Sequence, residues 1–151
     1  MESPEEDQQL RRPFRVLSLD GGGMRGIYTA AFLGRLTDQF ARIRGESALD
    51  LGRGFDLITG TSTGAIVGCA LAVGRPMTEI VELYREHGPK IFPHRIAGKR
   101  SAIYRATQGS RFVREGDKAL REALTAVLGD VTMLDVFEGR GISLSVPTVL
   151  M

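Results

Sequence analysis

Residues 55–73, with the sequence FDLITGTSTGAIVGCALAV, decide the fold. Residues 55–59 form a short apolar run that ends at Gly60, as a buried strand does. In residues 63–73 almost every side chain is small or apolar, so a helix here has to be buried on nearly all sides. The segment therefore predicts a buried strand, a sharp turn and a buried helix.

Further elements are predicted on both sides of this segment. Residues 15–19 and 142–146 have the patterns of short strands. A helix after residue 26 should turn Leu33, Leu36, Phe40 and Ile43 inward, and one from about 115 to 128 should bury Leu120, Ala123, Leu124, Val127 and Leu128 and end at Gly129. Another helix should have Thr78 as N-cap, carry Ile80, Leu83, Tyr84 and His87, and stop at Gly88-Pro89. Strands separated by helices favour an α/β fold around a mostly parallel sheet.

The composition is that of a globular protein. Of 151 residues, 42% are hydrophobic and 25% charged, and the net charge is +2. The single cysteine, Cys69, excludes an internal disulfide framework and a zinc cluster, and it favours a reducing compartment. The acidic start of the chain does not resemble a secretory signal, and no apolar run is long enough to span a bilayer. We therefore expect a cytoplasmic protein.

Basic residues are concentrated between residues 90 and 121, where nine Lys or Arg stand against two acidic residues. A solvated surface explains such a segment, and so does contact with anionic lipid headgroups. No nucleic-acid-binding motif accompanies it, so we expect no nucleic-acid partner. The residues for a peripheral membrane contact are Lys90, Arg95, Lys99, Arg100 and Arg105.

The turn Gly60-Thr61-Ser62-Thr63-Gly64 has the Gly-x-Ser-x-Gly pattern of a nucleophile elbow. In such an elbow a serine occupies a sharp strand-to-helix turn, and the helix N-terminus brings backbone N–H groups close to the reacting centre. Alone, the pattern also fits an ordinary tight turn with an incidental serine.

A second motif, Asp20-Gly21-Gly22-Gly23-Met24-Arg25-Gly26, lies between a predicted strand and a predicted helix. Consecutive glycines let several N–H donors turn toward one point, which suits a phosphate or an oxyanion. The motif also satisfies Gly-x-Gly-x-x-Gly, but the acidic residue that a dinucleotide site needs about 20 positions later is absent, since residue 41 is Ala. Dinucleotide binding is therefore the weaker interpretation.

Together, residues 20–26 and 60–64 resemble the patatin-like phospholipase family. The resemblance implies a three-layer α/β/α fold and a lipid acyl hydrolase that needs no cofactor or metal. It implies that Ser62 is the nucleophile, that residues Gly21 to Gly26 form the oxyanion loop, with N–H donors from Gly22 and Gly23 and a supporting Arg25, and that Asp20 pins this loop. Residues 1–12 would be a flexible leader, and residues 13–151 the N-terminal portion of the family's domain.

The family's second catalytic residue is an aspartate in an Asp-Gly-Gly or Asp-Gly-Ala motif well after the serine. The aspartates after Ser62 are Asp117, Asp130 and Asp135, and none is followed by glycine. His87 and His94 do not stand where an acid–histidine pair would need them. We therefore expect a fragment or truncated product that has little turnover by itself. The alternative is a catalytically inactive module that binds lipid or protein; some bacterial members respond to cyclic nucleotides, but no motif here indicates such a site.

Overall fold

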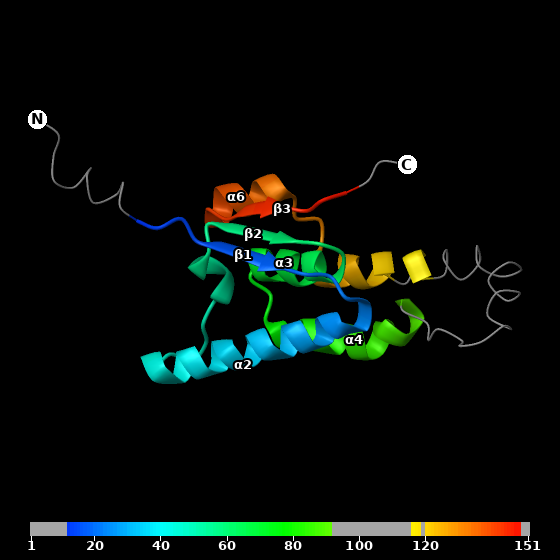
Figure 1. Ribbon diagram of the computed structural model, residues 1–151, viewed down its shortest axis with the longest axis horizontal. Helices are drawn as coiled ribbons and strands as arrows, with labels where there is room; N and C mark the ends of the chain where they lie inside the picture. The colour runs from blue at the N-terminus through cyan, green and yellow to red at the C-terminus, as the bar shows by residue number, and fades with distance from the viewer. Residues whose placement is uncertain (1–11, 92–115, 119, 149–151) are drawn as a thin grey trace, which may run out of the picture.

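The computed structural model describes residues 12–91, 116–118 and 120–148 (Figure 1). Three strands, β1 (Val16–Leu19), β2 (Leu57–Gly60) and β3 (Ser143–Ser145), form one parallel sheet in the order β1-β2-β3. Leu17, Ile58 and Leu144 are aligned across the sheet by its register. The predicted parallel α/β arrangement and all three predicted strands are thus confirmed, with bounds that differ by one or two residues.

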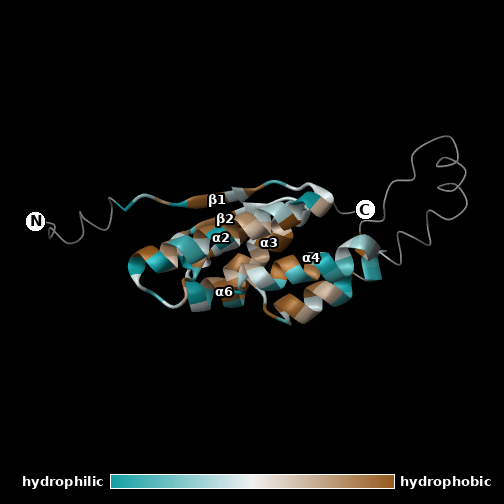
Figure 2. Ribbon diagram, turned by 90° about the horizontal axis from the view of Figure 1, so that it is seen from below, coloured by the Kyte–Doolittle hydropathy of each residue, from teal (hydrophilic) through white to brown (hydrophobic). Residues whose placement is uncertain are grey.

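The helices are α2 (Gly26–Arg44), α3 (Thr63–Val73), α4 (Met77–Ile91) and α6 (Met133–Arg140), with short 3-10 turns η1 (Gly23–Arg25) and η2 (Leu51–Gly54). Residues 116–118 and 120–128 are helical as well. In Figure 2 the strands β1 and β2 lie along one side of the molecule and α2, α3, α4 and α6 on the other, and α3 contacts α2, α4 and α6. This mixed arrangement of a parallel sheet and helices is consistent with the expected three-layer α/β/α fold in truncated form.

Helix α3 is the centre of the core, as its composition predicts. It contacts all three strands, and Val67, Ala70 and Ala72 have no exposed surface. Gly68 allows a close approach to the sheet, because a Cβ there would lie 3.1 Å from Ile58 Cγ2. The helix ends at Gly74, whose φ of 83° is a left-handed conformation that glycine adopts without strain.

Two helix predictions need correction. In α2 the buried residues are Gly26, Ala30, Leu33 and Ala41, whereas Phe40 and Ile43 are 43% and 70% exposed. Leu33 is thus buried as predicted, and the other buried residues are small, because α2 packs closely on α4, where a Cβ on Gly34 would lie 3.3 Å from Met77 Cβ. Spacing alone favours the larger side chains and so places Phe40 and Ile43 inward, which is wrong.

Helix α4 begins before Thr78 and continues through Gly88-Pro89 to Ile91, so the predicted cap and the predicted stop are both wrong. Glu79 N–H donates to Pro76 O at 3.1 Å, so the first turn of α4 starts at Pro76. Proline lacks an N–H, but an N–H at the start of a helix has no partner within the helix, so nothing is lost there. Ile80, Leu83 and Tyr84 are buried as predicted, and Figure 2 shows hydrophobic and hydrophilic residues alternating along α4.

Helix α6 is not among the sequence predictions. It begins with a capping box: Asp135 N–H donates to Thr132 Oγ1 at 3.1 Å, and Thr132 N–H donates to Asp135 Oδ2 at 2.8 Å. Hydrogen bonds from the Thr132 hydroxyl and backbone hold the pKa of Asp135 below its usual value. Near the other end, Arg140 binds both carboxylate oxygens of Asp50, at 2.9 and 2.7 Å.

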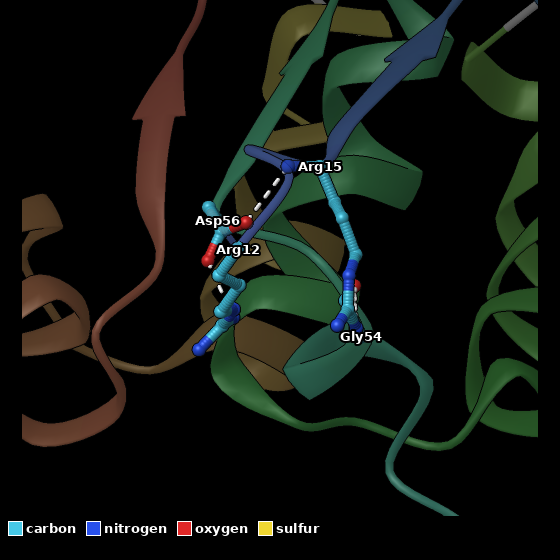
Figure 3. Close-up of polar contacts among 4 residues, drawn as sticks. All are labelled: Arg12, Arg15, Gly54 and Asp56. Carbon is cyan, nitrogen blue, oxygen red and sulfur yellow. Dashed lines mark hydrogen bonds and ion pairs between the residues drawn. The ribbon is translucent and has the colours of Figure 1, made fainter. Parts of the chain in front are cut away.

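The starts of β1 and β2 are joined by Asp56, as Figure 3 shows. Its carboxylate accepts from Arg12 Nη2 and from Arg15 N–H, both at 2.7 Å, and Arg15 Nη1 donates to Gly54 O at 3.4 Å. These bonds hold the two strands side by side where they begin. Consequently their carboxyl ends, at Leu19 and Gly60, also lie together.

Candidate active site

Ser62 occupies the turn between β2 and α3, and its backbone is strained. Its φ of 52° and ψ of −123° make it the one non-glycine residue with a positive φ in the described part of the chain. Such a conformation costs roughly 1–3 kcal/mol and persists only where the surroundings impose it, often at functional sites. The side chain is exposed at the carboxyl end of the sheet. A strained serine at a sharp strand-to-helix turn has the geometry of a nucleophile elbow.

The surroundings that impose this turn include two glycines with no room for a side chain. A Cβ on Gly60 would lie 2.6 Å from the carbonyl carbon of Gly64, and a Cβ on Gly64 would overlap Leu19 O. The first turn of α3 therefore packs directly on the end of β1. The Gly-x-Ser-x-Gly spacing thus follows from close backbone contacts on both sides of Ser62.

The glycine loop lies directly beside this turn. It leaves the sheet after Leu19, which pairs with Gly60, so the loop and the turn start from adjacent parallel strands. A Cβ on Gly21 would lie 2.9 Å from Ser62 Cβ and 2.7 Å from Thr61 O. The structure therefore brings together the two motifs that the sequence singles out.

Two hydroxyl groups of the turn bind the loop. Gly21 N–H donates to Thr61 Oγ1 at 3.1 Å, and Gly22 N–H donates to Thr63 Oγ1 at 3.0 Å. Asp20, which we expected to pin the loop, is exposed and has no hydrogen bond with the described residues. The two threonines on either side of Ser62 make these contacts instead.

The remaining loop amides divide into paired and unpaired groups. Arg25 N–H donates to Gly22 O at 3.2 Å, and Gly26 N–H is directed at the carbonyls of Gly23 and Met24. Among the described residues, the N–H groups of Gly23 and Met24 have no acceptor, and neither has that of Thr63 at the start of α3. Two of these unpaired donors belong to the glycine loop, and the third, Thr63 N–H, directly follows Ser62.

Arg25 and Tyr84 make hydrogen bonds to the glycine loop and to the Ser62 turn, respectively. Arg25 is exposed, and its Nε donates to Gly22 O at 3.4 Å, which keeps the guanidinium on the loop. The Tyr84 side chain is fully buried in α4, and its hydroxyl donates to Thr63 O at 3.4 Å. Burial raises the pKa of Tyr84 to about 12, so the phenol stays protonated at neutral pH. Gly26 packs against this hydroxyl, since a Cβ there would lie 2.6 Å from it.

No acid or base is hydrogen-bonded to Ser62 within the described segments. Asp117 is 3.9 Å from Arg121 in an exposed ion pair, and Asp135 caps α6. His87 is half-buried with its Nε2 3.8 Å from Glu86. His94 and the basic residues Arg95, Lys99, Arg100 and Arg105 lie outside the described residues, and nothing is described for the Lys90 side chain.

Several other features do not touch the site. A cavity of about 520 Å³ lies between α2, residues 47–51 and the α3–α4 turn, and no residue of the glycine loop or the Ser62 turn lines it. Burial raises the pKa of the Cys69 thiol, as expected for a structural cysteine. The described residues hold no cluster of three or more potential metal ligands, and none of their helices is long and apolar enough to cross a membrane.

A parallel α/β sheet with a Gly-x-Ser-x-Gly turn after one strand and a glycine loop after its neighbour is an arrangement of serine hydrolases. The chain belongs to the patatin-like phospholipase family, whose sequence model matches residues 17–148.

Similar proteins come from bacteria and plants. The chain is 29% identical over 153 residues to the cGAMP-activated phospholipase of Vibrio cholerae serotype O1, covering 99% of this chain and 41% of the relative. It is 37% identical over 128 residues to the cUMP-AMP-activated phospholipase of Escherichia coli, covering 85% and 33%. To patatin-like protein 2 of Arabidopsis thaliana it is 36% identical over 127 residues, covering 78% and 30%. No solved structure matches the chain.

The chain spans between 30% and 41% of the length of these relatives. Their names, together with the family match, support a lipid hydrolase in general terms.

Proposed function

We propose that this chain carries the nucleophile and the oxyanion-binding groups of a lipid acyl hydrolase of phospholipase A type. The observation that carries the proposal is the exposed, strained Ser62 beside Gly21 of the glycine loop, together with the N–H groups of Gly23, Met24 and Thr63, which have no acceptor among the described residues. A nucleophile and preorganised donors on rigid backbone are the two parts that acyl transfer from an ester needs.

In the proposed reaction, Ser62 Oγ attacks the carbonyl carbon of a lipid ester while a base removes its proton. The tetrahedral oxyanion accepts hydrogen bonds from the loop and the α3 N-terminus, where loss of one donor typically costs about 2.7–4 kcal/mol of transition-state stabilisation. The alkoxide of the lysolipid leaves and takes up a proton. Water then attacks the acyl-serine, which releases the fatty acid and restores the hydroxyl.

We propose that the base is the aspartate of a Ser–Asp dyad and that it comes from residues other than these 151. This is supported by the three aspartates after Ser62, which precede Lys and Val rather than Gly, and of which Asp117 and Asp135 are engaged elsewhere. The 151 residues by themselves should then show little turnover, because serine attack without a base is slow.

The proposed substrate is a membrane phospholipid or another acyl lipid, reached from the cytoplasmic side. The names of the bacterial relatives support a phospholipid. We propose that the basic residues between Lys90 and Arg105 make peripheral contact with anionic headgroups. Each such residue near the membrane surface would add roughly 1 kcal/mol to the free energy of membrane binding.

Hydrolysis of phospholipid vesicles by the full-length protein tests the proposal. Wild-type protein should release fatty acid, and Ser62→Ala should release at least about a thousandfold less. Ser18→Ala is the matched control, because Ser18 is an exposed serine on β1 and should leave the activity unchanged. A folded wild-type protein that binds vesicles but releases no fatty acid would instead support the alternative, an inactive lipid-binding module.

A further inference from the structure

The glycine loop and the Ser62 turn are joined by side chains rather than by sheet pairing. The ladder between β1 and β2 reaches one step beyond the strands, where Thr61 N–H donates to Leu19 O at 3.2 Å. Beyond that step the hydrogen bonds between the described residues of loop and turn are Gly21 N–H to Thr61 Oγ1 and Gly22 N–H to Thr63 Oγ1, across 40 and 41 residues of sequence.

These two bonds act where the backbone is least restrained. Three consecutive glycines have more accessible conformations than any other tripeptide, so their N–H groups would point in many directions without an external contact. The bonds hold the first two amides against the turn. The next two amides, of Gly23 and Met24, then remain without an acceptor.

We infer that Thr61 and Thr63 are positioning residues for the reaction, each holding one amide of the glycine loop so that the oxyanion donors stay aligned with Ser62. The inference rests on the proposed function of Ser62. It assigns to the two threonines of the turn a role distinct from the sharp turn itself, which the glycines provide.

The two threonines should differ in importance. Thr63 is 1% exposed, so water does not replace its hydroxyl if the bond to Gly22 is lost. The Thr63 carbonyl also accepts a hydrogen bond from the Tyr84 hydroxyl, which links Thr63 to α4. Thr61 is exposed, and a water molecule can take the place of its hydroxyl. Removal of the Thr63 hydroxyl should therefore have the larger effect.

The test compares Thr63→Val, Thr63→Ser and Thr61→Val in the full-length protein with a soluble short-chain ester. Valine keeps the shape but lacks the acceptor, whereas serine keeps the acceptor. Thr63→Val should lower kcat roughly 10- to 100-fold with little change in KM, as expected when alignment is lost but substrate binding is kept. Thr63→Ser should restore most of kcat, and Thr61→Val should reduce it only a few-fold.

Amide hydrogen exchange gives a second readout that does not depend on turnover. Gly22 N–H should exchange faster in Thr63→Val than in wild type, and at the wild-type rate in Thr63→Ser. If Thr63→Val keeps the wild-type kcat while wild type is active, the positioning role is wrong and the proposed function stands. If wild type hydrolyses no ester and Ser62 takes up no fluorophosphonate, both are wrong.

Discussion

At the scale of single residues, Ser62 and the glycines around it show how one strained position is held. The positive φ of Ser62 is unfavourable by itself, but the close packing around Gly21, Gly60 and Gly64 holds the turn in this conformation. The shortest contact at each of these glycines is with a backbone atom, and none of the three positions has room for a Cβ. The stability of the turn and the presentation of the serine therefore depend on the same atoms.

We predict that Gly64→Ala destabilises the protein by about 1–3 kcal/mol and reduces labelling of Ser62, because the new Cβ overlaps Leu19 O. Gly139→Ala is the matched control, since nothing lies within 4 Å of a Cβ there and α6 should gain from alanine. Urea unfolding measures both variants. Equal effects of the two substitutions would show that the backbone contact at Gly64 is not decisive.

Tyr84 predicts how stability depends on alkaline pH. Burial raises its pKa to about 12 in the folded protein, whereas an unfolded tyrosine has a pKa of 10.0. The contribution of the protonated Tyr84 phenol to the free energy of unfolding is fully present below pH 10. It is lost as pH rises toward 12, because the unfolded state releases the proton first.

Tyr84→Phe has no such proton, so its free energy of unfolding should fall less than that of wild type between pH 10 and 12. Urea unfolding of both proteins across this range gives the comparison. Parallel curves for the two proteins would mean that the phenol is not protected by the fold.

At the scale of elements, the sequence predicts what depends on local pattern. The bounds of α3 are recovered because its composition admits only a buried helix, and the three strands because each is a short apolar or alternating run. Helix α6 is missed because it is short and exposes Met133, Leu134 and Phe137, so only Val136 marks an inward face. The Thr132–Asp135 spacing is the signal that could have located its start.

We predict that Thr132→Ala lowers the free energy of unfolding by about 1 kcal/mol, while Thr132→Ser changes it little.

The bonds that lower the pKa of Asp135 act only on the ionised carboxylate. The stabilisation by this cap is therefore fully present above the usual pKa of aspartate and is lost as pH falls through the lowered pKa. Denaturation at neutral pH and at about pH 3 checks this. If the free energy of unfolding of wild type still exceeds that of Asp135→Asn in acid, the predicted pH dependence of the cap is wrong.

At the scale of the whole molecule, contacts between distant segments bring the two motifs together and join α6 to the segment before β2. The mostly parallel sheet follows from strands that are separated by helices, and so could be predicted. The hydroxyl bonds of Thr61 and Thr63 and the ion pair between Asp50 and Arg140 could not, because they join residues 40 to 90 positions apart through side-chain geometry.

The pair of Asp50 and Arg140 should contribute measurably to stability. Arg140 is 18% exposed and Asp50 34%, so Arg140→Gln should cost about 1–2 kcal/mol, less than a fully buried pair. A double-mutant cycle with Asp50→Asn isolates the interaction. Arg85→Gln is the control, because its pair with Glu82 is about two-thirds exposed on both sides and should be close to neutral. A coupling energy near zero for the first pair would refute this assignment.

Mass spectrometry of the full-length protein after treatment with a fluorophosphonate tests the central claim most directly. An activated Ser62 should gain one phosphonyl group, located on the peptide that contains residues 60–64, and Ser62→Ala should gain none. Labelling of another serine, or a folded wild-type protein that remains unlabelled, would contradict the assignment of Ser62 as the nucleophile.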